Sequence, residues 1–263
     1  MTVRNIALNF FKRGYSWVML DKLVARLREP GKGKNQRARS WYMKNAEDLE
    51  DLALNFNKQL FEESKEWNQR LEASAKQQLS KLDVKLGGGG NCVMLYYLVR
   101  KIQPSIVVET GVAAGFSSKT ILTALDHNKN GVLYSSDFPY FRLENPEQYV
   151  GILVEERLRK NWNLFVKGDE SNLPQIVNLI DGKKVDLFHY DSDKSYKGRD
   201  RALRIMINCF SSSTVIVFDD IVDNCHFMDT VLRNNWSFRI VRFEGKLIGI
   251  TAMSKETVDS LFS

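Results

Sequence analysis

The residues best suited to chemistry in this 263-residue chain are carboxylates that follow two predicted strands. Asp191 comes directly after the apolar run 185–190, and Asp219 and Asp220 come directly after the run 214–218. Adjacent parallel strands lie about 4.8 Å apart, so carboxylates at the same edge of a sheet can converge. A hard divalent cation relieves their mutual repulsion, and Mg²⁺ or Ca²⁺ prefers such oxygen ligands. The alternative is that the Asp219-Asp220 pair caps the next helix.

A glycine-bearing turn follows the buried-strand pattern of residues 106–109 and leads into a predicted helix. In an open α/β sheet, ligands bind at the carboxyl ends of the strands, where such a turn lets the backbone approach them. It is not a dinucleotide-binding motif, because only Gly111 matches and the next two glycine positions hold Ala113 and Phe116. A phosphate-binding loop that ends in Gly-Lys-Ser/Thr is also absent. The turn offers a strand-end acid, two glycines four residues apart and two hydroxyls, in Glu109, Gly111, Gly115, Ser117 and Ser118.

This turn resembles the first motif of the class I S-adenosylmethionine-dependent methyltransferases. The resemblance implies that Gly111 and Gly115 pass close to the methionine part of the donor and that Ser117 holds its carboxylate. It also implies that Glu109 orients the amino group, and that Asp137, at the end of the next strand, binds the ribose hydroxyls. The donor-binding set implied in this way comprises Glu109, Gly111, Ala113, Gly115, Ser117, Ser118, Asp137, Asp169 and Asp191.

The segment Asp191-Ser-Asp-Lys-Ser-Tyr, followed later by Phe-Asp-Asp-Ile, resembles the metal-dependent sugar and small-molecule O-methyltransferases of the macrocin O-methyltransferase type. The resemblance implies that Asp191, Asp219 and Asp220 hold a divalent metal, expected to be Mg²⁺, and that Asp193 is the catalytic general base. Many of these relatives carry histidine where this chain has Lys194. Lys194 is therefore expected either to pair with Asp193 or to bind an acidic substrate. The implied reaction is methylation of a hydroxyl on a small molecule or sugar.

Two other interpretations of the same residues stay open. In a metal-independent methyltransferase, the aspartates would cap helices and bind the donor. In an RNA-binding methyltransferase or binding module, the basic N-terminal residues would contact nucleic acid, although the chain lacks the usual RNA-binding motifs. Among the histidines, His189 is expected to be a core residue, and His226 is a candidate for contact with the substrate.

The elements that position these residues are predicted to form an α/β fold. Short β-rich runs alternate with helical ones, which indicates a Rossmann-like, seven-stranded, mostly parallel sheet with helices on both faces. The last two strands are separated by three residues only, so they are expected to form an antiparallel C-terminal hairpin. The predicted strands are 106–109, 132–136, 164–167, 185–190, 214–218, 238–243 and 247–252.

Residues 1–86 are predicted to be a helical, basic N-terminal extension to a methyltransferase domain at 87–263, with the boundary at the four glycines 87–90. Residues 1–45 hold eleven Lys and Arg against two acids, a net charge of +9, while the whole chain carries +6, so the remainder carries 6 − 9 = −3. Short basic helices and a linker at 31–37 are expected there, followed by one long helix over 46–82 with Asn45 as its N-cap. The apolar stripe of that helix is expected to pack on the core or, as the second use, in a homodimer.

Composition limits the setting in which the protein works. Three widely spaced cysteines give neither a disulfide framework nor a thiolate zinc site, which fits a reducing cytoplasm. No apolar run reaches the roughly eighteen residues needed to span a bilayer, and Lys12 and Arg13 interrupt the N-terminal apolar stretch. A cytoplasmic enzyme without a transmembrane segment is expected.

Overall fold

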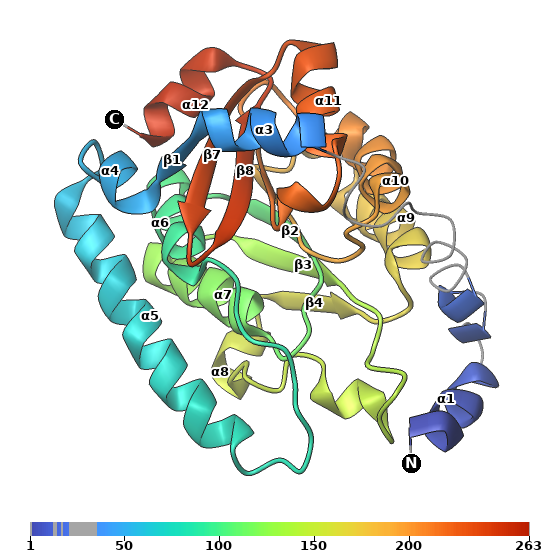
Figure 1. The fold of residues 1–263 in the computed structure, drawn as a ribbon. Helices are drawn as coiled ribbons and strands as arrows, with labels where there is room; N and C mark the ends of the chain where they lie inside the picture. The colour runs from blue at the N-terminus through green and yellow to red at the C-terminus, as the bar shows by residue number, and fades with distance from the viewer. Residues whose placement is uncertain (1, 13–14, 17, 21–35, 263) are drawn as a thin grey trace.

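The computed structural model describes residues 2–12, 15–16, 18–20 and 36–262 (Figure 1). Most of the predicted linker at 31–37 therefore lies outside the described residues. Among the described residues, no helix combines the length and the apolar character that crossing a bilayer requires.

One eight-stranded sheet forms the centre of the molecule, in the order β1-β7-β8-β6-β5-β2-β3-β4. All seven predicted strands are present, and the described chain adds one more at an edge. Only β8 runs antiparallel to its neighbours, β6 and β7, so the predicted C-terminal hairpin is confirmed. The strands are β1 (Ala46–Asp48), β2 (Ile106–Thr110), β3 (Val132–Ser136), β4 (Trp162–Phe165), β5 (Leu187–Tyr190), β6 (Val215–Phe218), β7 (Ser237–Phe243) and β8 (Lys246–Ala252).

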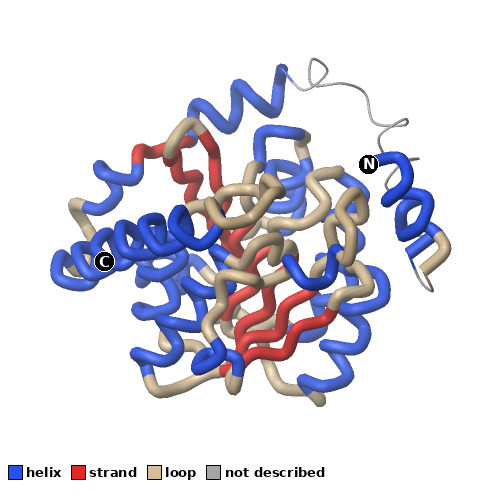
Figure 2. The backbone as a smooth tube through the Cα atoms, turned by 90° about the horizontal axis from the view of Figure 1, so that it is seen from below, coloured by secondary structure: helices blue, strands red, loops and turns tan. Residues whose placement is uncertain are grey.

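Helices cover both faces of the sheet (Figure 2). The central strands β2, β5 and β6 are buried along their whole length, as expected for parallel strands with helices on each side. One apolar layer unites the sheet with α4 (Leu49–Ala53), α5 (Lys58–Leu79), α6 (Cys92–Ile102), α7 (Phe116–Asn128), α8 (Glu156–Arg159) and α12 (Lys255–Leu261). The other layer unites it with α3 (Gln36–Asn45), α9 (Asp169–Ile180), α10 (Tyr196–Met206) and α11 (His226–Asn234). Short 3-10 turns are η2 (Pro146–Tyr149), η3 (Ile207–Cys209) and η4 (Ile221–Asp223), and α1 spans Thr2–Phe10.

The prediction of one continuous helix over 46–82 is wrong. The segment starts as β1, which pairs with β7, continues as α4 and forms its long helix only as α5. Asn57, rather than Asn45, is the N-cap of that helix, because its Oδ1 accepts a hydrogen bond from the Leu60 amide at 3.0 Å. The helical spacing of apolar residues was misleading because Leu49 and Leu52 belong to α4 but face the same core as Phe61 on α5.

The apolar stripe of α5 packs within this chain. Phe61 and Leu71 are buried, and α5 lies over α6 along the outside of the molecule (Figure 1). Core packing, the first of the two predicted uses, is therefore what the structure shows, and a homodimer through this helix stays a prediction. The proposed boundary at residue 87 separates two parts that share one hydrophobic core, because Leu49 and Phe61 belong to the same apolar cluster as Val107.

Candidate functional site

The strand order reverses between β5 and β2, and the predicted site lies at that point. The chain leaves β2 toward β3 on one side, while β5 and β6 extend the sheet on the other. Loops that follow adjacent strands diverge at such a switch point, so ligands of open α/β sheets bind there. The register places Thr110 on β2 opposite Tyr190 on β5, so the loops starting at Gly111 and Asp191 leave the same edge.

A cavity of about 200 Å³ lies at this edge. Five of the nine predicted donor residues line it, namely Gly111, Ala113, Asp137, Asp169 and Asp191. Gly111 has a φ of +85°, and a Cβ there would lie 2.3 Å from the carbonyl oxygen of Asp191. The glycine is therefore required by the close approach of the two loops and by its backbone angle.

Asp137 presents its carboxylate directly after β3, and Asp169 presents its carboxylate at the start of α9. Asp137 accepts hydrogen bonds from the amides of Ala113, at 2.8 Å, and Phe138, at 2.7 Å. Asp169 accepts from the hydroxyls of Ser136, at 2.6 Å, and Ser192. These bonds connect the loops after β2, β3, β4 and β5 around the cavity.

The other four predicted donor residues do not line the cavity. Glu109 is fully buried, and its Oε2 accepts hydrogen bonds from the hydroxyls of Ser118, at 2.6 Å, and Ser135, at 2.8 Å. Gly115 has a φ of +98°, and a Cβ there would lie 2.9 Å from the Cα of Gly151. Ser117 is buried in the first turn of α7. In this structure, these residues shape and anchor the loop from within rather than face the cavity.

Sequence reasoning missed several residues of the cavity wall. Arg201 pairs with Glu170 beside the cavity, and both line it. The helical period of α10 could have indicated Arg201, Ala202 and Ile205 as one face. No local pattern indicated Val18, which comes from the N-terminal segment. The wall residues outside the predicted site residues are Val18, Phe138, Gly168, Glu170, Tyr190, Ser192, Gly198, Arg201, Ala202 and Ile205.

The three predicted metal ligands do converge. Asp191, Asp219 and Asp220 each offer a carboxylate oxygen, and these oxygens lie within 4.8 Å of one another. Burial, together with the charge of Asp219, raises the pKa of Asp191 to about 6. The pKa of Asp219 is lowered in spite of its burial, because the charges of Lys194, His189 and Lys246 outweigh that effect.

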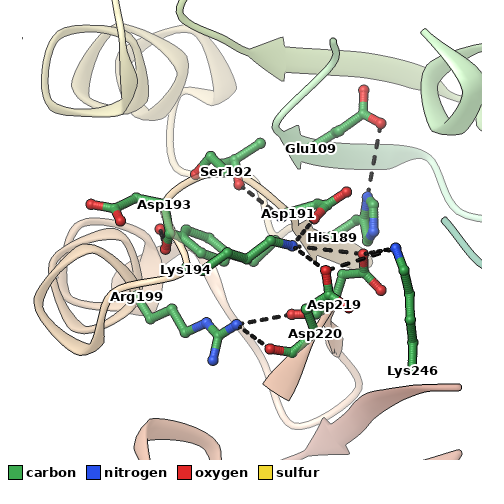
Figure 3. A network of polar contacts seen from close by, with 12 residues as sticks. Glu109, His189, Asp191, Ser192, Asp193, Lys194, Arg199, Asp219, Asp220 and Lys246 are labelled. Carbon is green, nitrogen blue, oxygen red and sulfur yellow. Dashed lines mark hydrogen bonds and ion pairs between the residues drawn. The ribbon is translucent and has the colours of Figure 1, made fainter. Parts of the chain in front are cut away.

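Lys194 pairs with this acidic cluster, and the prediction that it pairs with Asp193 is wrong. Its Nζ contacts Asp191 and lies 3.6 Å from Asp219 Oδ2 and 3.5 Å from Asp220 Oδ2 (Figure 3). Lys246 Nζ lies 3.9 Å from Asp219 Oδ2 and 3.7 Å from Asp220 Oδ2. Two ammonium groups therefore offset part of the charge of three carboxylates.

Asp193 points away from the acidic cluster (Figure 3). Its Oδ1 accepts a hydrogen bond from the amide of Ser195 at 3.0 Å, next to the start of α10. Its carboxylate lies against Gly198 and lines the cavity. The predicted role of Asp193 as general base thus concerns a group that lines the cavity rather than one in the acidic cluster.

Buried polar groups fix the two loops that carry the acidic cluster, one after β5 and one after β6. Arg199 is fully buried, and its Nη2 donates hydrogen bonds to the carbonyl oxygens of Asp219, at 3.0 Å, and Asp220, at 2.8 Å (Figure 3). Asn224 donates to the carbonyl oxygen of Lys194 at 2.7 Å. Asp220 has a φ of +49°, a left-handed conformation that these bonds help to maintain.

The two histidines of this region lie in the core. His189 is 3% exposed, and its Nδ1 lies 3.8 Å from Glu109 Oε1, a distance at which the interaction is electrostatic. Burial tends to lower the pKa of His189, but Glu109 and Asp191 raise it. His226 is 1% exposed and packs on Tyr196 and Phe218, so it is enclosed by side chains rather than presented to a ligand.

Comparisons with known proteins agree with this geometry. Residues 108–221 match the family model described as a methyltransferase domain. No curated protein matches the chain. Similar solved structures include a putative caffeoyl-CoA O-methyltransferase from Staphylococcus aureus, with 12% identity, a TM-score of 0.54 and coverage of 74% of this chain and 98% of that one.

Two further structures show the same fold. An O-methyltransferase from Bacillus cereus in complex with S-adenosylhomocysteine has 15% identity, a TM-score of 0.52 and coverage of 74% of this chain and 90% of that one. A methyltransferase from Geobacter sulfurreducens has 17% identity, a TM-score of 0.51 and coverage of 70% and 89%. The matched region spans the glycine turn and all three clustered aspartates, so residues 108–221 are similar to a methyltransferase domain, and the solved structures share its fold.

Proposed function

We propose that this enzyme transfers the methyl group of S-adenosylmethionine to a hydroxyl of a small molecule or sugar. The observation that supports the proposal is the double position of Asp191, which lines the cavity and also belongs to the acidic cluster. An acceptor oxygen bound at the cluster would therefore be adjacent to a donor bound in the cavity. Methyl transfer needs such an in-line approach, because the protein mainly aligns the acceptor oxygen with the sulfonium carbon.

The donor would be held by the loops after β2, β3 and β4. Asp137 and Asp169 are the acceptors available for the ribose hydroxyls, because each carboxylate oxygen has two lone pairs and can accept beyond its present bonds. Gly111 and Ala113 bring backbone close to the same cavity. Glu109 would act indirectly, by fixing the position of this turn through Ser118.

The acidic cluster has the donor set that a hard divalent cation prefers, three carboxylates within reach of one ion. Asp191, Asp219 and Asp220 would hold Mg²⁺, and Lys194 would have to leave the carboxylates to admit it. A bound metal would supply charge that lowers the pKa of an acceptor hydroxyl. The position of Lys194 also favours a second candidate, a metal-independent methyltransferase in which its ammonium group supplies that charge.

Lys194 and Asp193 would then have different tasks. The carboxylates around Lys194 raise its pKa in spite of burial, so its ammonium stays charged and can stabilise a developing oxyanion. Asp193 would accept the acceptor's proton only if the acceptor extends to the wall at Gly198, because its carboxylate faces that side.

Titration calorimetry with S-adenosylhomocysteine and, separately, with Mg²⁺ tests the proposal. The wild type should bind the nucleoside, and a diol acceptor should be methylated when labelled donor is supplied. Asp220→Asn should weaken Mg²⁺ binding and turnover together while leaving nucleoside binding unchanged. Asp223→Asn is the matched control, because Asp223 is exposed and outside the cluster.

Each result distinguishes the candidates. Turnover that survives chelation, together with no detectable Mg²⁺ binding, would support the metal-independent enzyme. Loss of turnover on chelation, restored by added Mg²⁺, would support the metal-dependent one. A wild type that fails to bind S-adenosylhomocysteine would refute the proposed function in both forms.

A further inference from the structure

We infer that the N-terminal segment is part of the donor site, and that Val18 forms a wall for the adenine ring of the donor. The segment is defined here as α1 together with Lys12, Tyr15 and Val18. The inference rests on the proposed function, because it assigns a further part of the same donor cavity. It also departs from the expectation that residues 1–86 lie outside the donor-binding domain.

The segment is anchored to the loop that follows β3 (Figure 1). Asn9 is 3% exposed, and its Nδ2 donates hydrogen bonds to the carbonyl oxygens of Phe141 and Leu143, both at 2.9 Å. Lys12 Nζ and Tyr15 Oη both bond to Glu147 Oε1, at 2.9 and 2.7 Å. These contacts join parts of the sequence more than 130 residues apart.

Beyond this anchor, the segment reaches the cavity. The ring of Tyr15 packs on that of Phe138, with centroids 4.8 Å apart, and Phe138 lines the cavity directly after Asp137. Val18 lines the cavity as well, and both of its methyl carbons lie 3.3 Å from the position of a Cβ added at Gly168. The glycine thus leaves room for a side chain from the N-terminal segment.

The cavity combines two kinds of wall. Among its lining residues, Asp137 and Asp169 provide hydrogen-bond acceptors, and Val18, Phe138 and Ile205 provide apolar side chains. A purine nucleoside has the same two parts, since its ribose carries hydroxyls and its base has flat, weakly hydrated faces. The N-terminal segment would therefore contribute selectivity for the base, while the strand-end acids bind the sugar.

Calorimetry on the full-length protein tests this inference with S-adenosylhomocysteine and with adenosine. Val18→Asp places a carboxylate against the base, in a cavity that Asp137 and Asp169 already line. Both ligands should therefore bind at least about ten-fold more weakly. Glu147→Gln loosens the anchor without altering the cavity wall, and the Kd of both ligands should rise about three- to ten-fold. Glu144→Gln, an exposed acid on the same loop, is the matched control and should bind as the wild type does.

The two failures can be told apart. If the wild type binds neither ligand, the proposed function fails, and this inference fails with it. If the wild type binds both and if Val18→Asp and Glu147→Gln bind them equally well, the inference alone is overturned. Weaker binding of S-adenosylhomocysteine by Val18→Asp with unchanged binding of adenosine would also overturn it, because the effect would not involve the base. Thermal unfolding of each variant establishes that it is folded.

Discussion

We predict that the protein loses free energy of unfolding between neutral and mildly acidic pH because of His226. Neither ring nitrogen of this buried histidine has a hydrogen-bond partner among the residues that the structure describes. Its ring packs on those of Tyr196 and Phe218, with centroids 5.2 and 5.5 Å away. Burial, together with the charge of Arg199, lowers the pKa of His226 from 6.5 to about 4.

The size and sign of the effect follow from linkage. Between pH 6.5 and about 4 the unfolded chain binds a proton at His226 that the folded chain excludes. This part of the stability is therefore complete above pH 6.5 and is lost as the pH falls through that window. From about pH 7 to about pH 5 the loss amounts to about 2 kcal/mol, since one unit of pKa shift corresponds to about 1.4 kcal/mol.

Urea denaturation of the wild type and of His226→Phe at both pH values measures this contribution. The substitution keeps an aromatic ring and removes no hydrogen bond of the ring, so its effect at pH 7 should be limited to packing. Other groups titrate equally in both proteins, so their effect cancels when the two free energies of unfolding are subtracted. From about pH 7 to about pH 5, this difference in free energy of unfolding should shift by about 2 kcal/mol in favour of the variant. The reasoning is refuted if that difference is the same at both pH values.

Three other predictions follow from single contacts. Gly111→Ala should weaken binding of S-adenosylhomocysteine at least about ten-fold in calorimetry, because its Cβ would lie 2.3 Å from the Asp191 carbonyl oxygen. Gly182→Ala, which also has a positive φ but nothing within 4 Å of the added Cβ, should bind normally. Arg199→Met should lower the free energy of unfolding by about 2–4 kcal/mol, because it removes the hydrogen bonds from a fully buried guanidinium to the carbonyl oxygens of Asp219 and Asp220, whereas the exposed Arg204→Met should not. Tyr42→Phe should cost about 1–2 kcal/mol in urea denaturation, because the fully buried hydroxyl donates to the Asn224 carbonyl at 2.9 Å, and an unchanged midpoint would contradict this.

The sequence alone determined the sheet and the edge at which the site lies. Runs such as 106–109 and 214–218 are apolar on both faces, and only a strand covered by helices on each side buries such a run. The acids and glycines that follow these strands must then gather at the carboxyl ends. For this reason the convergence of Asp191, Asp219 and Asp220 could be predicted from the order of strands and acids along the chain.

The direction of individual side chains depended on tertiary packing. Glu109 ends its strand as the motif suggests, yet its carboxylate turns into the protein, because Ser118 and Ser135 bond to it there. Lys194 and Asp193 are neighbours in sequence but face opposite sides of their loop. Loop conformation sets such directions, and no repeating pattern in the sequence reports it.

Long-range pairing decided the rest. Residues 46–48 directly precede the helical apolar spacing that starts at Leu49, but pairing with the edge of β7 makes them a strand. Val18 reaches the cavity because Asn9 and Tyr15 bond to a loop more than 130 residues away. Contacts over such distances in the chain form only when the whole fold closes, since each depends on groups that local propensity does not bring together.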